Sequence, residues 1–204
     1  FQTTVGRLLF NSVLPSDHDF VNTQVTQKML FKVSIDIIDE RGPEAVPAIV
    51  DKLKKLGFKY ATVSGTTWGI DEVKVPAGKA NIIEESRAEE QKVFAFYDEG
   101  LISRDERRRM IVEIWHRAKT RLEKLLPETL DHNGSAFEMW DSGARGSLGQ
   151  IAQMAGMKGL IVNTRGETIE FPVLSSMKEG MSPLEYFITT HGSRKGLADT
   201  ALQT

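Results

Sequence analysis

The sequence has no cysteine, few aromatic residues and almost no net charge. Without cysteine it can form neither a disulfide nor a thiolate metal site, a composition compatible with a cytosolic protein. The formal net charge of −2 argues against a uniformly basic surface for nucleic acid, although a local basic patch is compatible with it. We find neither a signal-peptide pattern nor an apolar run long enough to span a bilayer, and expect no membrane association.

The apolar content that is present, 40% of 204 residues, is sufficient for one large domain or two small ones. Residues 5–14 read as an apolar strand or a short helix that ends at Pro15. The spacing of apolar residues predicts a helix over 23–40. A second helix is predicted over 44–56, with Gly57 just after its end.

The turn after Pro15 contains Asp17, His18 and Asp19, which raises the question of a metal site. Two carboxylates and an imidazole at adjacent positions rarely converge on one ion, so a solvated turn is favoured over a ligand set.

Residues 79–126 predict an antiparallel helical hairpin, with arms over 79–99 and 104–126. Ser103 and Glu106 have the spacing of a capping box at the start of the second arm. The first arm has six acidic and three basic residues, and the second has four acidic and eight basic residues, which favours their pairing. The run Arg107-Arg108-Arg109 is interpreted as a solvated face that pairs with the acidic arm, or alternatively as a docking surface.

Residues 139–150 contain a single arginine, Arg145, between Gly143 and Gly146. The stretch is neither a nucleophile elbow nor a P-loop, because it lacks the glycine and lysine positions that those motifs require. Glycines allow a ligand to approach the backbone, and a guanidinium suits a phosphate, so Arg145 is either a phosphate-binding residue or part of a structural turn.

Two β-rich runs within 159–172 flank the turn residues 164–166 and predict a small β-hairpin. The last predicted helix begins with Ser182 as cap, Pro183 at the first helical position and Glu185 three residues after the cap. Gly192 and Gly196 lie four residues apart in it, which indicates a bend or a very close neighbour.

The sequence begins with Phe1 rather than methionine, and this last helix reaches Thr204 without a stop signal. We therefore expect a truncated fragment of a larger subunit, whose sequence continues for at least three more helical turns.

Four stretches resemble the largest subunit of bacterial RNA polymerase, the β′ subunit, in the order in which that family has them. They comprise residues 3–7 with Asn11, Leu14 and Pro15; 58–71; 141–147 with Gly156, Met157, Gly159 and Leu160; and 182–204. Residues 186–202 are similar to the start of the bridge helix. The segment between the second and third stretches resembles the paired rim helices beside the secondary channel. The family's Phe-Arg-Glu-Gly-Leu loop appears here as residues 177–181, with Met177, Lys178 and Met181 as departures. Gln203 stands where the family usually has a basic residue.

The resemblance implies DNA-templated RNA synthesis, in which two magnesium ions support nucleotidyl transfer. The family's magnesium motif, Asn-Ala-Asp-Phe-Asp-Gly-Asp, is absent from this sequence and is expected upstream of it. The resemblance thus implies Mg²⁺ bound outside this fragment, with no catalytic residue and no metal ligand within it, and a fragment that is inactive alone. The implied partners are the β, α, ω and sigma subunits, template DNA and RNA, nucleoside triphosphates and Gre-type regulators. The implied location is cytoplasmic and nucleoid-associated.

Carried over residue by residue, the resemblance implies four groups of site residues. Those near the nucleotide phosphates are Arg145 and Met139. Those of the bridge helix near the template and active centre are Arg194, Lys195, Asp199, Gln203 and Thr204. Gly192 and Gly196 are the implied hinge. The implied regulator-docking residues are Asp98, Glu99, Arg104, Arg107 and Arg108.

The predicted fold class is α+β and mostly helical, with the helical hairpin, the small β-hairpin and irregular multi-helix packing. The predicted regions are a helical funnel base (1–78), the projecting rim helices (79–130), the secondary-channel wall with the β-hairpin (131–181) and the N-terminal part of the bridge helix (182–204). Two alternatives stay open: a stand-alone helical-hairpin module that binds protein, and a purely structural assembly segment.

Overall fold

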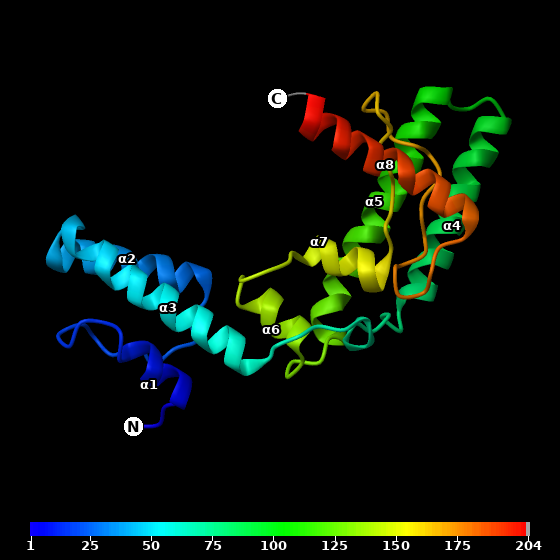
Figure 1. The fold of residues 1–204 in the computed structure, drawn as a ribbon. Helices are drawn as coiled ribbons and strands as arrows, with labels where there is room; N and C mark the ends of the chain where they lie inside the picture. Colours follow the sequence, from blue (N-terminus) through cyan, green and yellow to red (C-terminus); the bar gives the residue numbers. More distant parts are fainter. Residues whose placement is uncertain (203–204) are drawn as a thin grey trace. The chain divides into compact units, whose positions relative to one another are not determined.

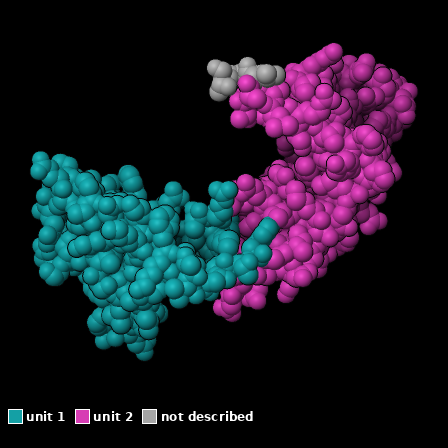
Figure 2. All heavy atoms as spheres, in the orientation of Figure 1, with its two compact units in different colours: residues 1–68, 138–145 teal, residues 69–137, 146–204 magenta. Residues whose placement is uncertain are grey.

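The computed structural model describes residues 1–202, which are mostly helical (Figure 1). The chain divides into two compact units (Figure 2). Unit 1 comprises residues 1–68 and 138–145, and unit 2 comprises the remainder of the chain. Among residues 1–202, no helix combines the length and the apolar character needed to cross a bilayer.

Unit 1 contains α1 (Val5–Asn11), α2 (Gln27–Arg41), the short 3₁₀ helix η1 (Pro43–Ala45) and α3 (Val46–Ser64). The first stretch is therefore a helix rather than a strand, and the Thr4 hydroxyl caps it by accepting from the Arg7 amide at 3.4 Å. Buried aliphatic side chains of α2 and α3 and of the loop between α1 and α2 form its core: Leu14, Val21, Val33, Ile37 and Ile49.

The prediction that the helix over 44–56 ends at Gly57 is wrong, because α3 continues to Ser64 and ends at Gly65. Gly65 has a φ of 61°, a left-handed value that ends helices readily and suits glycine. Gly57 stays in the helix interior although glycine costs about 1 kcal/mol there relative to alanine. Gly57 has no positive φ and continues the helix. Lysines followed by a glycine were therefore not sufficient to predict the end of a helix.

Unit 2 contains the predicted hairpin, formed by α4 (Lys79–Asp98) and α5 (Arg104–Thr129). The Ser103–Glu106 capping box is present at the start of α5. Charged residues pair across the arms as predicted: Arg117 with Glu89, and Arg121 with Glu85 at 2.7 Å. The buried core between the arms contains Ile82, Val93, Ile111, Ile114, Trp115, Ala118 and Leu122, joined by Met157.

The remaining helices are η2 (Ile70–Glu72), α6 (Ser135–Asp141), α7 (Leu148–Ile151), the π-helix η3 (Ala152–Gly156) and α8 (Pro183–Leu202). η3 packs on α5, where the position of a Gly156 Cβ would lie 3.8 Å from the Leu122 Cβ. This close approach brings residues 152–157 onto the base of the hairpin.

The predicted β-hairpin over 159–172 is not supported. Within residues 1–202 this segment forms only two isolated antiparallel bridges, Gly159 with Val173 and Val162 with Thr168. The Asn163 side chain accepts from the amides of Arg165 and Glu167, at 2.9 and 3.0 Å, and so forms a tight turn between the two bridged runs. The fold is consequently helical with a bridged loop, rather than α+β with a hairpin.

Candidate functional site

The loop that carries Arg145 follows α6 in unit 1. Gly143 and Gly146 flank it with φ values of 74° and 93°, which a side chain would strain. The Arg145 amide donates to the Met139 carbonyl at 3.3 Å, so the two predicted phosphate-site residues lie together. Arg145 is exposed, and no ion pair engages its guanidinium among residues 1–202. The geometry therefore leaves its charge available to an anionic ligand.

Helix α8 runs without interruption through Gly192 and Gly196. A Cβ at Gly192 would lie 3.2 Å from the Ile161 Cγ2, whereas nothing lies within 4 Å at Gly196. Gly192 thus fits the prediction of a very close neighbour. The role of the two glycines as a hinge stays a prediction.

The other bridge-helix residues differ in their surroundings. Lys195 pairs with Asp199 at 2.8 Å, one helical turn further on. Arg194 is exposed, and no described residue forms an ion pair with it. The predicted residues Gln203 and Thr204 lie outside the described residues.

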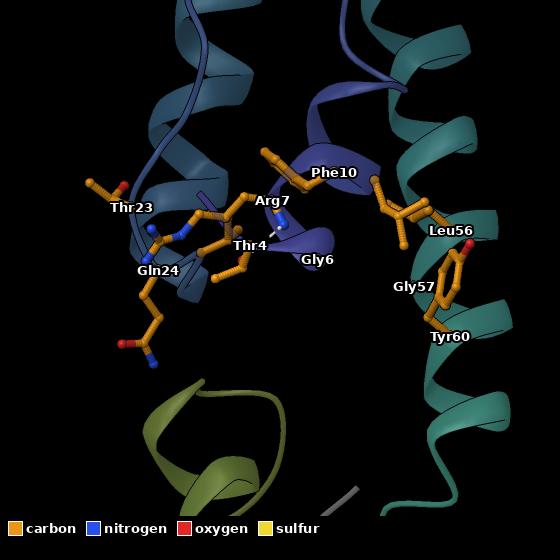
Figure 3. Close-up of a pocket in the computed structure, with 11 residues that line it drawn as sticks. Thr4, Gly6, Arg7, Phe10, Thr23, Gln24, Leu56, Gly57 and Tyr60 are labelled. Atoms are coloured by element: carbon orange, nitrogen blue, oxygen red, sulfur yellow. Dashed lines mark hydrogen bonds between the residues drawn. The ribbon is translucent and has the colours of Figure 1, made fainter. Parts of the chain in front are cut away.

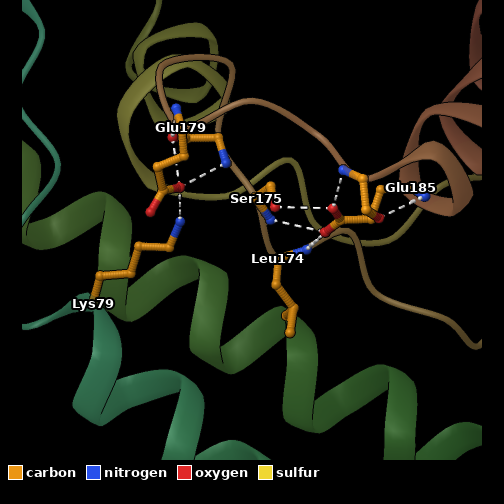
Figure 4. A network of polar contacts seen from close by, with 7 residues as sticks. Lys79, Leu174, Ser175, Glu179 and Glu185 are labelled. Carbon is orange, nitrogen blue, oxygen red and sulfur yellow. Dashed lines mark hydrogen bonds and ion pairs between the residues drawn. The ribbon is translucent and has the colours of Figure 1, made fainter.

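The start of α8 is held by Glu185, whose side chain is buried with the residue 8% exposed. Its carboxylate accepts from the amides of Leu174 and Ser175 at 3.0 Å, from the Ser175 hydroxyl at 2.9 Å and from the Ser182 amide at 2.9 Å (Figure 4). The Ser182 hydroxyl in turn accepts from the Glu185 amide at 3.3 Å, which completes the predicted capping box.

The pKa of Glu185 is lowered from 4.5 to about 2. Burial acts against ionisation, but the hydrogen bonds from Ser182 and Ser175 favour the carboxylate more strongly. Ionised Glu185 therefore stabilises the folded protein at every pH above about 4.5.

We expect the free energy of unfolding to fall as the pH drops from about 4.5 to about 2. In this range Glu185 becomes protonated in the unfolded chain but stays ionised in the folded protein. A pKa shift of this size corresponds to a loss of about 3 kcal/mol in the free energy of unfolding. Glu185→Gln should remove this part of the pH dependence in urea unfolding of the chain. Glu84→Gln, an exposed carboxylate of α4, serves as control. A difference between wild type and Glu185→Gln that stays constant from pH ~6 to ~2 would contradict the prediction.

The tip of the hairpin carries the predicted regulator-docking residues. Asp98, Glu99 and Arg104 are exposed. Arg107 instead donates to Glu170 at 3.0 Å and lies over the Tyr97 ring, 4.5 Å from its centre. Arg108 donates to the Thr168 carbonyl at 2.8 Å.

The interpretation of the arginine run as a face that pairs with the acidic arm therefore fails for two of its three members. Arg107 and Arg108 hold the bridged loop 159–173 against α5, and Arg109 is the exposed member.

Unit 1 also contains a hollow of about 590 Å³ between α1, residues 23–25 and α3 (Figure 3). Phe10, Leu56 and Tyr60 are among its apolar lining residues, and Gly57 lies on its α3 side with no atom within 4 Å of a Cβ built there. Arg7 lies at its edge and donates to Asn22 at 3.2 Å.

The turn at residues 17–19 exposes Asp17 and Asp19 to solvent, as favoured from the sequence, and contacts the end of α2. Asp17 pairs with Arg41, and the His18 ring, whose side chain is 5% exposed, lies 3.3 Å from Glu40. Among residues 1–202, no cluster of three or more histidine, aspartate or glutamate side chains could hold a metal ion.

Comparison with known proteins identifies the relatives of this chain. The family described as RNA polymerase Rpb1, domain 4, matches residues 100–192. Proteins described as "DNA-directed RNA polymerase subunit beta'" are similar over the whole chain, with 44% identity in Acidothermus cellulolyticus, 45% in Kineococcus radiotolerans and 43% in Pelotomaculum thermopropionicum. The chain is homologous to one segment of the bacterial RNA polymerase β′ subunit. It spans 16–17% of the length of these β′ relatives.

The residues 100–192 that match this family include α5, the Arg145 loop and the first half of α8. Two sets of contacts in this chain were not foreseen from sequence: Glu185 with residues 174–175, and Lys79 with Glu179. The capping pattern located Glu185, but nothing in the sequence indicated that its carboxylate also binds residues that precede the cap. Lys79 and Glu179 are 100 positions apart and carry no local signal.

Proposed function

We propose that the chain is the part of a DNA-dependent RNA polymerase β′ subunit that forms the wall of the channel through which nucleotides enter, with the rim helices and the N-terminal part of the bridge helix. The observation that carries this proposal is the similarity to β′ subunits along the whole chain. The charge-paired hairpin and the exposed Arg145 beside Met139 are compatible with it.

In this function the assembled polymerase is a nucleotidyltransferase that makes RNA on a DNA template. The Mg²⁺ ions that support phosphoryl transfer are bound by residues outside this chain. Within the chain, Arg145 and Met139 meet the incoming nucleoside triphosphate, and Arg194, Lys195 and Asp199 lie on the helix that borders the template. The partners are the β, α, ω and sigma subunits, nucleic acid and Gre-type regulators, in the cytoplasm with the nucleoid.

A segment exchange tests the proposal directly. The corresponding segment of a β′ subunit that can be reconstituted into active polymerase is replaced by residues 1–204, and the polymerase is reconstituted. We expect assembly and RNA synthesis within about tenfold of the parent enzyme, since the similarity covers the whole segment. A chimaera that assembles but makes no RNA would exclude the proposed function.

The hairpin tip gives a second test. Arg104→Glu and Arg109→Glu should each weaken binding of a Gre-type factor by up to about fivefold, since an exposed ion pair contributes ~0.2–1 kcal/mol. Basal RNA synthesis should change less. Both residues are exposed, so the changes leave the loop contacts of Arg107 intact.

Lys124→Glu, an exposed change near the other end of α5, is the matched control for the hairpin tip. Factor affinity that is unchanged by both tip variants, or lowered equally by the control, would show that the tip is not the docking surface.

A further inference from the structure

The loop of residues 174–182, here called the clasp loop, is attached to two helices by two carboxylates. Consecutive residues of the loop bind opposite partners (Figure 4). Ser175 donates through its amide and hydroxyl to Glu185 of α8. Ser176 donates through its amide and hydroxyl to Glu179, at 2.9 and 2.7 Å. The two attachments are therefore made by adjacent residues.

Glu179 also bonds to Lys79, the first residue of α4. Lys79 is 6% exposed, and a buried ammonium group needs an anionic partner to offset its lost hydration. This ion pair ties the clasp loop to the base of the helical hairpin. The side-chain hydrogen bonds and the ion pair of Lys79 and Glu179 stay within α4 and the clasp loop.

At its other end the clasp loop is tied to α8. The Glu185 carboxylate accepts from residues 174–175 at the start of the loop and from Ser182 at its end, so one carboxylate binds both ends of the loop. The loop amides of Met177 and Lys178 also donate to the η3 carbonyls of Gln153 and Met154, at 3.1 and 3.0 Å. A short, heavily bonded loop of this kind has little freedom to absorb a displacement of either helix.

We propose that Lys79 is a positioning residue for α8, and that it acts across the clasp loop through Glu179, Ser176, Ser175 and Glu185. This proposal rests on the proposed function, because that function is what identifies α8 as the bridge helix. It implies that a partner that shifts the hairpin also alters the start of α8.

The test uses the complete β′ subunit in the assembled polymerase. Lys79→Gln should speed amide hydrogen exchange at residues 183–190 about tenfold, the effect of losing one charge-assisted bond. Exchange in α5 should be unchanged, which verifies an intact fold. Lys79→Arg, which keeps the charge, should restore most of the protection.

Lys178→Gln is the matched control, because Lys178 lies in the same loop but donates to Ile70 rather than to α4. If Lys79→Gln does not assemble, Glu179→Gln carries the same expectation, because Glu179 bonds to Ser176 and Lys79 and not to α8. The double variant Lys79→Gln/Glu179→Gln should be no worse than either single variant, since the two residues act as one pair.

Nucleotide addition supplies a readout that loop stability alone would not change. Lys79→Gln should lower kcat several-fold with little change in KM for nucleotides, because α8 is displaced while the phosphate site is untouched. Unaltered exchange at 183–190, or an equal effect of Lys178→Gln, would overturn the proposal. Wild-type polymerase that makes no RNA would instead overturn the proposed function, and the exchange measurement does not depend on it.

Discussion

Replacing Arg145 with alanine in the assembled polymerase is expected to lower kcat/KM for nucleotides by roughly tenfold to hundredfold. The change removes one charge-assisted contact to phosphate, which contributes about 1.5–3 kcal/mol. A guanidinium that meets the β- and γ-phosphates offsets charge that develops as pyrophosphate leaves, so part of the loss should fall on kcat. Single-nucleotide addition measured across nucleotide concentrations separates the two constants.

Arg145→Lys should recover only part of the loss, because an ammonium group cannot form the paired contacts of the guanidinium fork. Arg165→Ala is the matched control: Arg165 is also exposed and also precedes a glycine of positive φ, Gly166 at 84°. Normal nucleotide kinetics in Arg145→Ala, combined with a lower melting temperature, would assign Arg145 to a structural turn.

Replacing Trp115 with alanine is expected to lower the unfolding free energy of unit 2 by about 3–5 kcal/mol. Trp115 is 1% exposed at the centre of the α4–α5 core, and its ring nitrogen donates to Glu90 at 3.0 Å. The substitution leaves a cavity between the arms and an unpaired carboxylate oxygen, and both effects destabilise the hairpin. Urea unfolding followed by far-ultraviolet circular dichroism measures the change.

Trp115→Phe should cost less, about 1–2 kcal/mol, because it keeps most of the buried area and loses the hydrogen bond. Phe96→Ala is the control on the outer face of α4, where the side chain is 43% exposed, and should change stability by less than about 1 kcal/mol. A Trp115→Ala variant no less stable than this control would show that the arms do not form the core of unit 2.

Local patterns predicted the helix starts well. Ser103 with Glu106, and Ser182 with Glu185, are capping boxes in the structure because each pair lies three residues apart and needs no distant partner. The charge asymmetry of the hairpin arms likewise predicted pairing that the structure contains.

Predictions failed where distant residues decide the outcome. The β-hairpin was predicted from β-rich runs, but Asn163 takes up the turn amides and Arg108 takes up the Thr168 carbonyl. The arginine run was interpreted as pairing with the acidic arm, yet Arg107 forms its ion pair with Glu170 and Arg108 donates to Thr168, 63 and 60 positions away. Contacts of this separation follow from tertiary packing, which local spacing does not encode.

The surface also differs from what local patterns suggest. Phe58 and Val63 of α3 are each 71% exposed although both side chains are large and apolar. Leu184, Phe187 and Leu197 of α8 are exposed as well. The apolar spacing after Ser182 correctly predicted α8, whereas the extension of α3 to Ser64 was missed; residues 1–202 do not cover the apolar side chains of either segment.

The open space beside Gly196 makes this position suitable for chemical labelling. No atom lies within 4 Å of a Cβ built there, and its backbone is helical, so a cysteine side chain fits without displacing a neighbour. The sequence contains no other thiol, so a maleimide dye attached at Gly196→Cys would mark a single site of this chain. A fluorophore at that point would report the curvature of α8 in real time, whereas the same group at Gly192 would press against Ile161.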